Sequence, residues 1–282
     1  MNPPQAADPP SVLLHPEGIG RSATTAAVGY IPEIDGLRAF AVLSVMLYHL
    51  NRHLLPGGFV GVDTFFVISG YVVTSSLWRD VGRPFGGMIV QFYARRVLRI
   101  VPALAVCLLV TAIPTVLFIP DAWINQTIRD TGIWAFFGAS NIAMFNAETY
   151  FSPAVELNPF AQTWTLGVEE QFYVLLPGII YLFVRSRFWP ALPRVLCRNL
   201  LPVLCVLSFL ILVWNSAGDQ KDSFYLLPAR FWELGLGALL FQVRVRGKFS
   251  PLLPASRHGL LAVGSLIGVA AGIFAQDALD RD

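Results

Sequence analysis

The sequence predicts an all-α, polytopic transmembrane helix bundle, and three observations lead to this fold class. Hydrophobic residues make up 55% of the 282 residues and charged residues only 13%, whereas soluble domains average about 25% charged residues. The mean hydropathy is +0.60, and apolar runs recur along the chain. Because so few charged side chains cannot cover a globule of this size, most of the chain must face lipid or other apolar segments. A net charge of +2 gives no reason to expect a nucleic-acid partner.

The chain divides into a tail, a membrane domain and a second short tail. Residues 1–29 are rich in Pro, Ala, Ser and Thr without apolar periodicity, so we expect a flexible tail that is not a cleavable signal peptide. We expect one transmembrane domain over residues 30–275 and a polar tail at 276–282. Seven runs have about the 20 residues that a membrane span needs. They are Ile34–Leu55, Phe59–Leu77, Ile100–Pro120, Trp164–Val184, Asn199–Gly218, Ser223–Val243 and Gly259–Ala275.

An eighth apolar run, Thr131–Ala147, is shorter and contains glycine and asparagine residues, so it either crosses the membrane or dips in and returns. Lys and Arg accumulate on cytoplasmic loops, and here they cluster at 79–99, 185–198 and 244–257. A full crossing by the eighth run would put the second cluster outside. A re-entrant segment puts all three clusters inside. The charges therefore favour about seven full spans, a cytoplasmic N-terminus and one re-entrant segment facing outside.

Several chemistries have no support in the sequence. The three cysteines and four histidines show no CxxC pair or metal-ligand spacing, so we expect neither a disulfide framework nor a metal site, and no bound cofactor. The chain has no GxSxG, HExxH, phosphate-loop or dinucleotide motif. The HxxxxD pattern of soluble glycerolipid acyltransferases is also missing, because no aspartate lies five positions after His49 or His53.

Ionisable residues within the apolar runs are the candidate functional residues, because a charge at membrane depth costs a few kcal/mol. Arg38 and His49 are eleven residues apart on one predicted helix. They therefore project from nearly the same face, roughly 16 Å apart along the axis. A neutral imidazole could accept a proton from a hydroxyl group. The alternative is a structural histidine that bonds to a neighbouring helix.

Three arginines, Arg95, Arg96 and Arg99, form an RRxxR array just before the third predicted span. Arginine suits phosphate binding because its planar guanidinium group donates several hydrogen bonds in a fixed fork. A phosphorylated co-substrate at the cytoplasmic mouth of the bundle would use such a cluster. The alternative is an anchor that only sets the orientation of the helix.

Two groups of charged residues lie close to the starts of predicted spans. Glu169 and Glu170 are consecutive, so they should not both face lipid. They either orient a substrate hydroxyl or an arginine, or they favour the helix N-terminus through its dipole. Arg230 and Glu233 are three residues apart on a predicted helix and are expected to form an internal salt bridge.

Five segments, taken in order, resemble the membrane-bound acyltransferase family 3, which includes bacterial O-antigen, exopolysaccharide and peptidoglycan O-acetyltransferases. One is the opening helix with Arg38 and His49 in an RxxxxxxxxxxH arrangement, and another is the arginine motif. The segments are Ile31–His49, Gly58–Tyr71, Phe92–Pro102, Thr163–Tyr173 and Leu227–Gly237.

The resemblance implies an enzyme of the bacterial inner membrane that moves an acyl group, with acetyl favoured, from cytoplasmic acyl-CoA to an extracytoplasmic glycan or lipid-linked saccharide. Arg95, Arg96 and Arg99 would hold the phosphates of acyl-CoA. Arg38 and His49 would lie along the acyl route, with His49 as the general base or a transient acyl carrier. Glu169 would help to position the acceptor. The remaining motif residues are expected to be structural or to lie on the acceptor side: Asp35, Asp63, Tyr71, Glu170, Tyr173, Arg230 and Glu233.

Two other functions stay open at this stage. The first is a transporter or acyl-relay subunit, because intramembrane Arg, His and Glu residues also suit a proton relay. The second is an inactive, shortened member of the family, because the family usually has more spans than the seven expected here. A short chain could also complete its bundle with a partner subunit. The arginine array distinguishes the acyltransferase from the transporter, since an acyltransferase needs it for CoA and a proton-coupled carrier does not.

Overall fold

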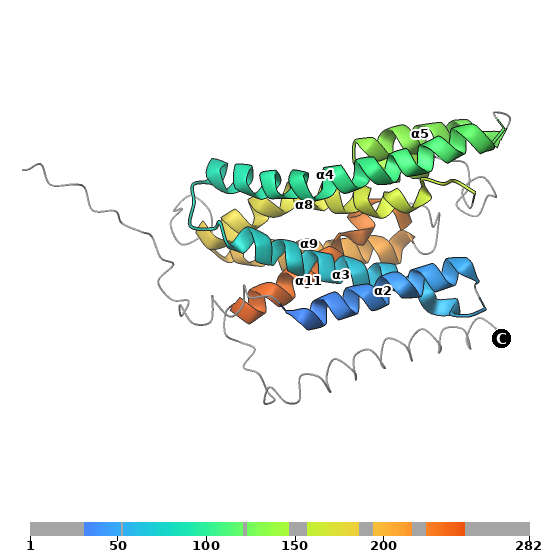
Figure 1. The fold of residues 1–282 in the computed structure, drawn as a ribbon. Helices are drawn as coiled ribbons and strands as arrows, with labels where there is room; N and C mark the ends of the chain where they lie inside the picture. The colour runs from blue at the N-terminus through green and yellow to red at the C-terminus, as the bar shows by residue number, and fades with distance from the viewer. Residues whose placement is uncertain are drawn as a thin grey trace, which may run out of the picture.

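The computed structural model describes residues 31–51, 53–120, 123–146, 157–185, 194–215 and 224–245. Every regular element in these ranges is a helix (Figure 1), so the predicted all-α class is confirmed for this part of the chain. The expected tails at 1–29 and 276–282 and the apolar run Gly259–Ala275 lie outside the described residues.

Six long helices form the bundle, and four short ones complete the described fold. The long helices are α2 (Pro32–Leu50), α3 (Gly61–Trp78), α4 (Phe85–Phe118), α8 (Trp164–Arg185), α9 (Arg194–Asn215) and α11 (Leu227–Val245). The short ones are the 3₁₀ turns η1 (Pro56–Val60) and η3 (Ala161–Thr163) and the helices α5 (Gln126–Phe136) and α6 (Ser140–Phe145). Proline marks the N-terminus of two of the long helices: Pro32 is the first residue of α2, and Pro84 directly precedes α4.

Four segments in the described ranges are long and apolar enough to cross a membrane. They are Pro56–Trp78, Phe85–Phe118, Ala161–Val184 and Val195–Asn215. Helices α2 and α11 have 19 residues each but carry three charged residues apiece. The chain is thus a membrane protein with at least four candidate spans, and the total of seven and the N-terminal orientation stay predictions.

Helix α4 differs from the predicted span Ile100–Pro120, because it already begins at Phe85. Its 34 residues make it about 51 Å long, compared with about 30 Å for the hydrocarbon core of a bilayer. No proline interrupts the helix between Pro84 and Pro102, so the arginine motif continues the helix instead of forming a loop before it.

The eighth apolar run is broken in two. Helix α5 has 11 residues and α6 has six, and Gly138 lies between them with φ 65°, a conformation that favours glycine. Neither helix has the length of a span. This agrees with the expectation that Thr131–Ala147 does not cross as one helix, and its re-entrant path stays a prediction.

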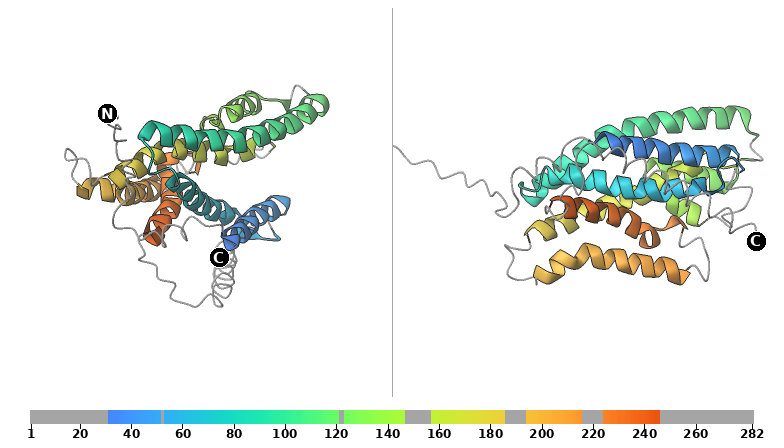
Figure 2. Two further views of the ribbon diagram at one scale, coloured as in Figure 1. Left: turned by 60° about the vertical axis from the view of Figure 1, so that its left-hand side comes forward. Right: turned by 90° about the horizontal axis from the view of Figure 1, so that it is seen from below.

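The long helices alternate in direction, as Figures 1 and 2 show. The N-terminal ends of α2, α4 and α9 and the C-terminal ends of α3, α8 and α11 lie together at one end of the bundle (left in Figure 1). Basic residues fall at this end: Arg79 and Arg83 in the connection after α3, Arg198 in the first turns of α9 and Arg244 in the last turn of α11. We call this the basic end, and the other the opposite end.

The centre of the bundle is a close contact between α3 and α11. A Cβ atom at Gly70 would collide with the carbonyl oxygen of Leu234, and one at Gly237 would collide with that of Val67. The two backbones therefore touch, as they do where small residues line transmembrane helix contacts. Around this contact lies a buried core of aliphatic and aromatic side chains, and its aromatic members include Phe66, Trp78, Phe92, Trp164, Phe172, Tyr173 and Phe241.

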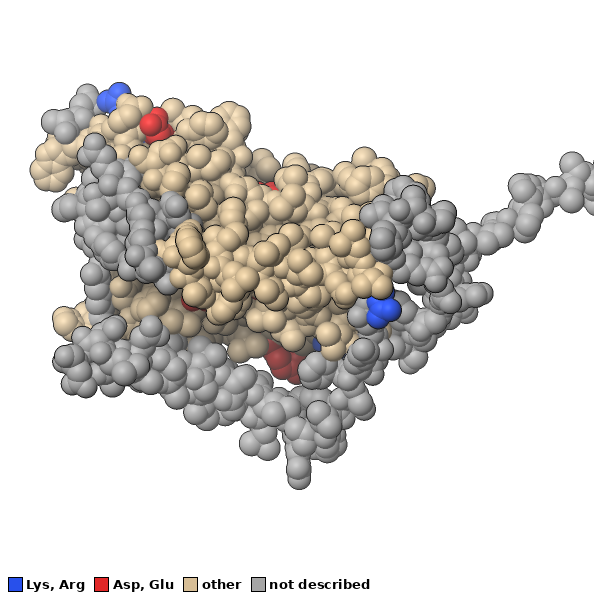
Figure 3. All heavy atoms as spheres, turned by 180° about the vertical axis from the view of Figure 1, so that it is seen from behind, with Lys and Arg blue, Asp and Glu red and all other residues tan. Residues whose placement is uncertain are grey.

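The outward faces of α4 and α9 are largely apolar. Large hydrophobic side chains of α4 and α9 are exposed on them, and Figure 3 shows one face on which uncharged side chains cover most of the described area. This surface suits contact with lipid.

We expect the substitution Gly237→Ala to destabilise the bundle by about 1–3 kcal/mol, because its methyl group overpacks the α3–α11 contact. The measurement is the thermal unfolding midpoint of the protein in detergent. Gly178→Ala is the matched control, since a Cβ at Gly178 meets nothing within 4 Å. An unfolding midpoint for Gly237→Ala as high as that of the control would contradict the role of this contact.

Candidate active site

A buried polar cluster lies in the middle of the apolar bundle, where α3, α4 and α8 meet. The Ser69 hydroxyl donates a 2.7 Å hydrogen bond to Oε1 of Glu169, and the Tyr173 hydroxyl donates a 2.5 Å bond to Oε2. The two hydroxyl oxygens are 3.3 Å apart. All three side chains are buried. Glu169 and Tyr173 are one turn apart on α8, so the sequence places both on the face that α3 covers.

Arg96 of α4 supplies positive charge to this cluster. Its guanidinium carbon lies 3.7 Å from the ring centroid of Tyr173, which is a cation–π contact. Arg96 and Arg38 both attract the Glu169 carboxylate electrostatically. The Tyr93 hydroxyl, one turn before Arg96 on α4, donates a 3.0 Å hydrogen bond to the carbonyl oxygen of Tyr173. The predicted site residues Glu169, Tyr173 and Arg96 therefore come together.

The pair predicted on α2 is divided between two environments. The Arg38 guanidinium lies 5.8 Å from the ring centroid of Phe65 on α3, and its Nε is buried without a hydrogen-bond partner. His49 is exposed near the C-terminus of α2, and its Nδ1 lies 2.9 Å from the carbonyl oxygen of Val45. Because a carbonyl only accepts, this contact puts the proton on Nδ1 and leaves Nε2 as the basic nitrogen. Within the described ranges, no hydrogen bond joins His49 to Arg38 or Glu169.

The three arginines of the RRxxR array also point to different places. Arg95 forms an ion pair with the buried Asp80, which also binds Arg83 at 3.2 Å. Arg96 faces the central cluster, and Arg99 is exposed. Since residues on a helix turn by about 100° each, adjacent positions 95 and 96 cannot share one face. The structure thus does not bring the three guanidinium groups together on one surface.

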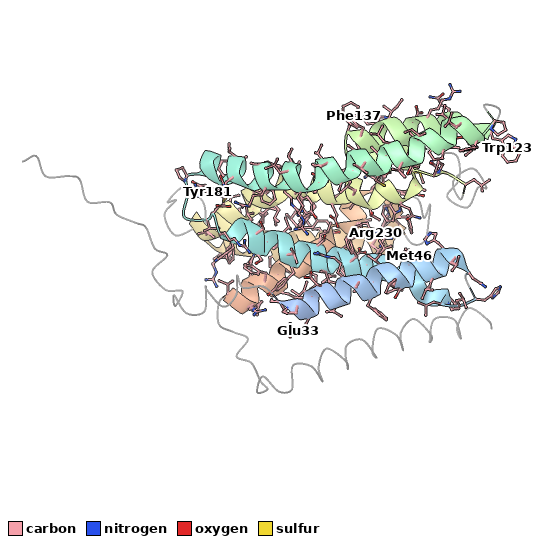
Figure 4. All side chains as sticks on the ribbon, viewed as in Figure 1. Glu33, Met46, Trp123, Phe137, Tyr181 and Arg230 are labelled. Carbon is pink, nitrogen blue, oxygen red and sulfur yellow. The ribbon has the colours of Figure 1, made fainter. Side chains whose placement is uncertain are left out.

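A second, partly buried charge cluster lies where α3 and α11 begin. Arg230 Nη1 lies 2.7 Å from Oδ1 of Asp63 and 2.8 Å from Oε1 of Glu233, which confirms the predicted Arg230–Glu233 salt bridge. Arg230 also donates to the carbonyl of Phe224 and lies over the rings of Phe224 and Trp164. Figure 4 shows the Arg230 side chain lying among the helices of the bundle. The other carboxylate oxygen of Glu233 is buried without a partner.

The remaining predicted residues lie at the edges of these clusters. The hydroxyl of Tyr71 accepts a 2.9 Å hydrogen bond from Arg244 at the basic end. Asp35 is exposed and lies 3.8 Å from Arg38. Glu170 is partly buried and packs beside the helix break at Gly138, where a Cβ would lie 3.3 Å from its Cγ.

Sequence reasoning missed three members of these clusters: Ser69, Tyr93 and Asp80. Ser69 and Tyr93 lie inside the quoted family segments, but a hydroxyl in an apolar run gives no sign that it faces a carboxylate on a distant helix. Asp80 follows an arginine in a short connection, which is typical of a solvated loop. Its burial depends on Arg83 and Arg95, and only the fold brings these together.

An apolar cleft of about 570 Å³ lies elsewhere, between the C-terminal half of α4 and α5. Its lining includes Leu109, Val116, Ile128, Ile133 and Phe136, with Arg129 among the few polar members. No predicted site residue lines it. No group of three His, Cys, Asp or Glu side chains in the described ranges is placed to hold a metal ion.

The sequence of the chain matches one known protein family over most of its length. Residues 31–280 match the family described as the acyltransferase domain, Acyl_transf_3. The chain belongs to this acyltransferase family. The match includes every residue of both buried clusters, so the family assignment and the central geometry concern the same part of the molecule.

Curated relatives in the family are bacterial O-acetyltransferases. The chain is 33% identical to the peptidoglycan O-acetyltransferase OatA of Listeria monocytogenes over 246 residues, which are 85% of this chain and 38% of the relative. It is 37% identical to the putative peptidoglycan O-acetyltransferase YrhL of Bacillus subtilis over 212 residues, 75% of this chain and 33% of the relative. It is also 37% identical to the O-acetyltransferase OatA of Staphylococcus aureus, over 75% of this chain and 34% of the relative. The chain thus spans only about a third of the length of these relatives. No solved structure matches the chain.

We expect the substitution Arg230→Met to destabilise the protein by about 3–5 kcal/mol, because it leaves the buried Glu233 carboxylate without a counter-charge. The measurement is again the unfolding midpoint in detergent. Arg83→Met is the control, since the Arg83 side chain is 56% exposed and Asp80 keeps Arg95. Adding Glu233→Gln to Arg230→Met should restore part of the stability, because it removes the unpaired charge. An Arg230→Met protein as stable as the control would contradict this account.

Proposed function

We propose that the chain is an O-acyltransferase that moves an acetyl group from cytoplasmic acetyl-CoA to a hydroxyl group of an extracytoplasmic cell-envelope glycan. The bacterial inner membrane is then its location, with the basic end in the cytoplasm. The observation that carries the proposal is the buried Ser69–Glu169–Tyr173 cluster beside Arg96, within a chain of the acyltransferase family. The named activities of the relatives support the choice of acetyl and of a glycan acceptor, with peptidoglycan first among the candidates.

Transfer from a thioester to an alcohol needs a base for the hydroxyl proton and positive charge for the developing oxyanion. Glu169 can serve as a base, since hydroxyl groups already donate hydrogen bonds to both of its carboxylate oxygens. Arg96 and Arg38 supply positive charge beside it. His49 offers Nε2 as a second base toward the opposite end, where the acceptor would approach.

The basic end suits the CoA phosphates. Arg95 is held there by Asp80, which follows α3, and Arg99 is exposed one turn further along α4 than Arg95. An incoming phosphate can replace Asp80 as the partner of Arg95, because arginine binds carboxylate and phosphate with the same fork geometry. The three arginines of the array then divide the work: Arg95 and Arg99 bind phosphate, and Arg96 serves the reaction centre.

A transporter or acyl-relay subunit is the alternative function. The buried carboxylates and arginines would suit a proton relay, and the partnerless oxygen of Glu233 favours this reading. The two functions differ in their products, because only the acyltransferase yields an esterified glycan.

The substitution His49→Ala should lower acetyl transfer by about 100-fold or more, because a general base contributes about 10²- to 10⁴-fold to rate. The assay follows labelled acetyl from acetyl-CoA into peptidoglycan fragments, with purified protein in liposomes. His53→Ala, a change at an exposed residue of the adjacent loop, is the control and should transfer normally. Near-normal transfer by His49→Ala would remove His49 from the mechanism.

Replacing Arg95 and Arg99 together by Gln should weaken acetyl-CoA binding by roughly tenfold or more, since a hydrogen bond to a charged group contributes about 1.5–3 kcal/mol. Titration calorimetry of the protein in detergent measures this affinity. Arg198→Gln, which removes an exposed arginine of α9 at the same end, should leave it unchanged. If CoA affinity holds in the double variant while acceptor affinity falls, the arginines do not bind CoA.

A further inference from the structure

The proposed reaction must carry an acyl group across the bundle, and this raises the question of which group receives it. CoA phosphates at the basic end and an acceptor at the opposite end are separated by about 28 Å, the length of a 19-residue helix. Ser69 lies eight residues after the start of α3 at Gly61 and nine before its end at Trp78. It is thus about 12 Å from the opposite end of α3 and about 14 Å from the basic end. Ser69 therefore lies close to the midpoint between the two ends.

We propose that Ser69 is a nucleophile that carries the acyl group as an ester between acyl-CoA and the acceptor, with Glu169 as its base. This inference rests on the proposed acyltransferase function and adds to it a covalent intermediate at a residue that had no assigned role.

The hydrogen bonding of Ser69 differs from that of four other buried hydroxyls, which donate within their own helices. A Ser or Thr in an apolar helix ordinarily donates to the carbonyl oxygen four residues earlier in its own helix. The buried hydroxyls that do so here are those of Ser44, Thr74, Thr115 and Thr131. Ser69 donates instead to a carboxylate on another helix, at 2.7 Å. A hydroxyl within hydrogen-bond reach of a base is the arrangement that an activated nucleophile requires.

The groups around Ser69 also hold the base in place. Tyr173 donates to the second oxygen of Glu169 at 2.5 Å, so the carboxylate is fixed with Oε1 facing Ser69. A nucleophile, its base and a third group that orients the base form the pattern of covalent acyl transfer. Arg96, which stacks on Tyr173 and attracts Glu169, supplies positive charge close to the carbon that would be attacked.

The first half of the reaction forms the Ser69 ester. As the Ser69 Oγ attacks the thioester carbon of acyl-CoA, its proton passes to Glu169. The tetrahedral intermediate then collapses, the carbon–sulfur bond breaks, and the CoA thiolate takes the proton from Glu169. The products are acyl-Ser69 and CoA with a free thiol.

The second half reverses these roles. The acceptor hydroxyl gives its proton to Glu169 by way of His49 Nε2 on the acceptor side and attacks the ester carbon, the bond to Ser69 breaks, and Glu169 returns the proton to the Ser69 oxygen. The net reaction converts acyl-CoA and an alcohol into an ester and CoA, and leaves the protein unchanged.

The test uses the full chain in liposomes with labelled acetyl-CoA and no acceptor, so that the intermediate accumulates. The protein is quenched with acid, digested and analysed by mass spectrometry for acetylated residues. We expect acetyl on Ser69 in the wild type and none there in Glu169→Gln. Ser69→Ala should lose more than about 1,000-fold in transfer to peptidoglycan fragments, as expected for loss of a nucleophile, and should still bind acetyl-CoA.

Thr74→Val is the matched control, because it removes another buried hydroxyl of α3 that bonds only within its own helix. It should keep both the acetyl-Ser69 adduct and transfer, which would show that the loss in Ser69→Ala is specific. An unlabelled Ser69 in acceptor-free wild type overturns the proposal whatever the activity of Ser69→Ala. Label on Tyr173 or His49 in place of Ser69, or near-normal transfer by Ser69→Ala, also overturns it.

The two proposals fail in different ways. If wild type transfers acetyl to glycan but Ser69 is unlabelled, Ser69 is not the acyl carrier, and the proposed acyltransferase function stands. If wild type neither transfers acetyl nor becomes labelled, both the proposed acyltransferase function and the proposed role of Ser69 are wrong.

Discussion

The backbone contact between α3 and α11 is the constraint on which the rest of the site depends. Gly70 and Gly237 let the two helices touch, and this fixes their relative height and rotation. The same register sets Asp63 opposite Arg230 and turns Ser69, next to Gly70, toward α8. Glycine is therefore selected here by the missing Cβ, since any larger side chain would separate the helices and, with them, both polar clusters.

The polar clusters are arranged so that each buried charge has a partner. In an apolar interior an unpaired charge is far more costly than an unpaired dipole, so Arg230 is held by two carboxylates and Glu169 by two hydroxyls and nearby arginines. The Glu169 cluster differs in being joined by hydroxyl hydrogen bonds instead of direct ion pairs. Hydroxyl protons can move while the heavy atoms stay in place, which makes this cluster the one suited to chemistry.

Much of this architecture could be predicted from the sequence. The lengths of the apolar runs indicate where the helices lie, and the placement of basic residues indicates that successive helices run in opposite directions. The helices α3, α8 and α11 begin and end within a few residues of the predicted spans, and the i,i+3 spacing of Arg230 and Glu233 gave their salt bridge. The start of α4 was missed because a charged amphipathic stretch can extend a helix beyond its membrane span. Ser69 was missed because its partner is 100 residues away in the chain, and only tertiary packing brings the two together.

Helix α4 continues without a loop from the arginine motif into the apolar span, and this has a mechanical consequence. A helix much longer than the bilayer is thick adjusts to a thinner or thicker membrane by tilting. Arg96 and the apolar half of α4 belong to one continuous helix, with Pro102 between them as a position where the helix can bend. A tilt of the apolar half moves the guanidinium group over the Tyr173 ring to the extent that bending at Pro102 does not absorb it. To that extent, the geometry at Glu169 depends on the thickness of the surrounding bilayer.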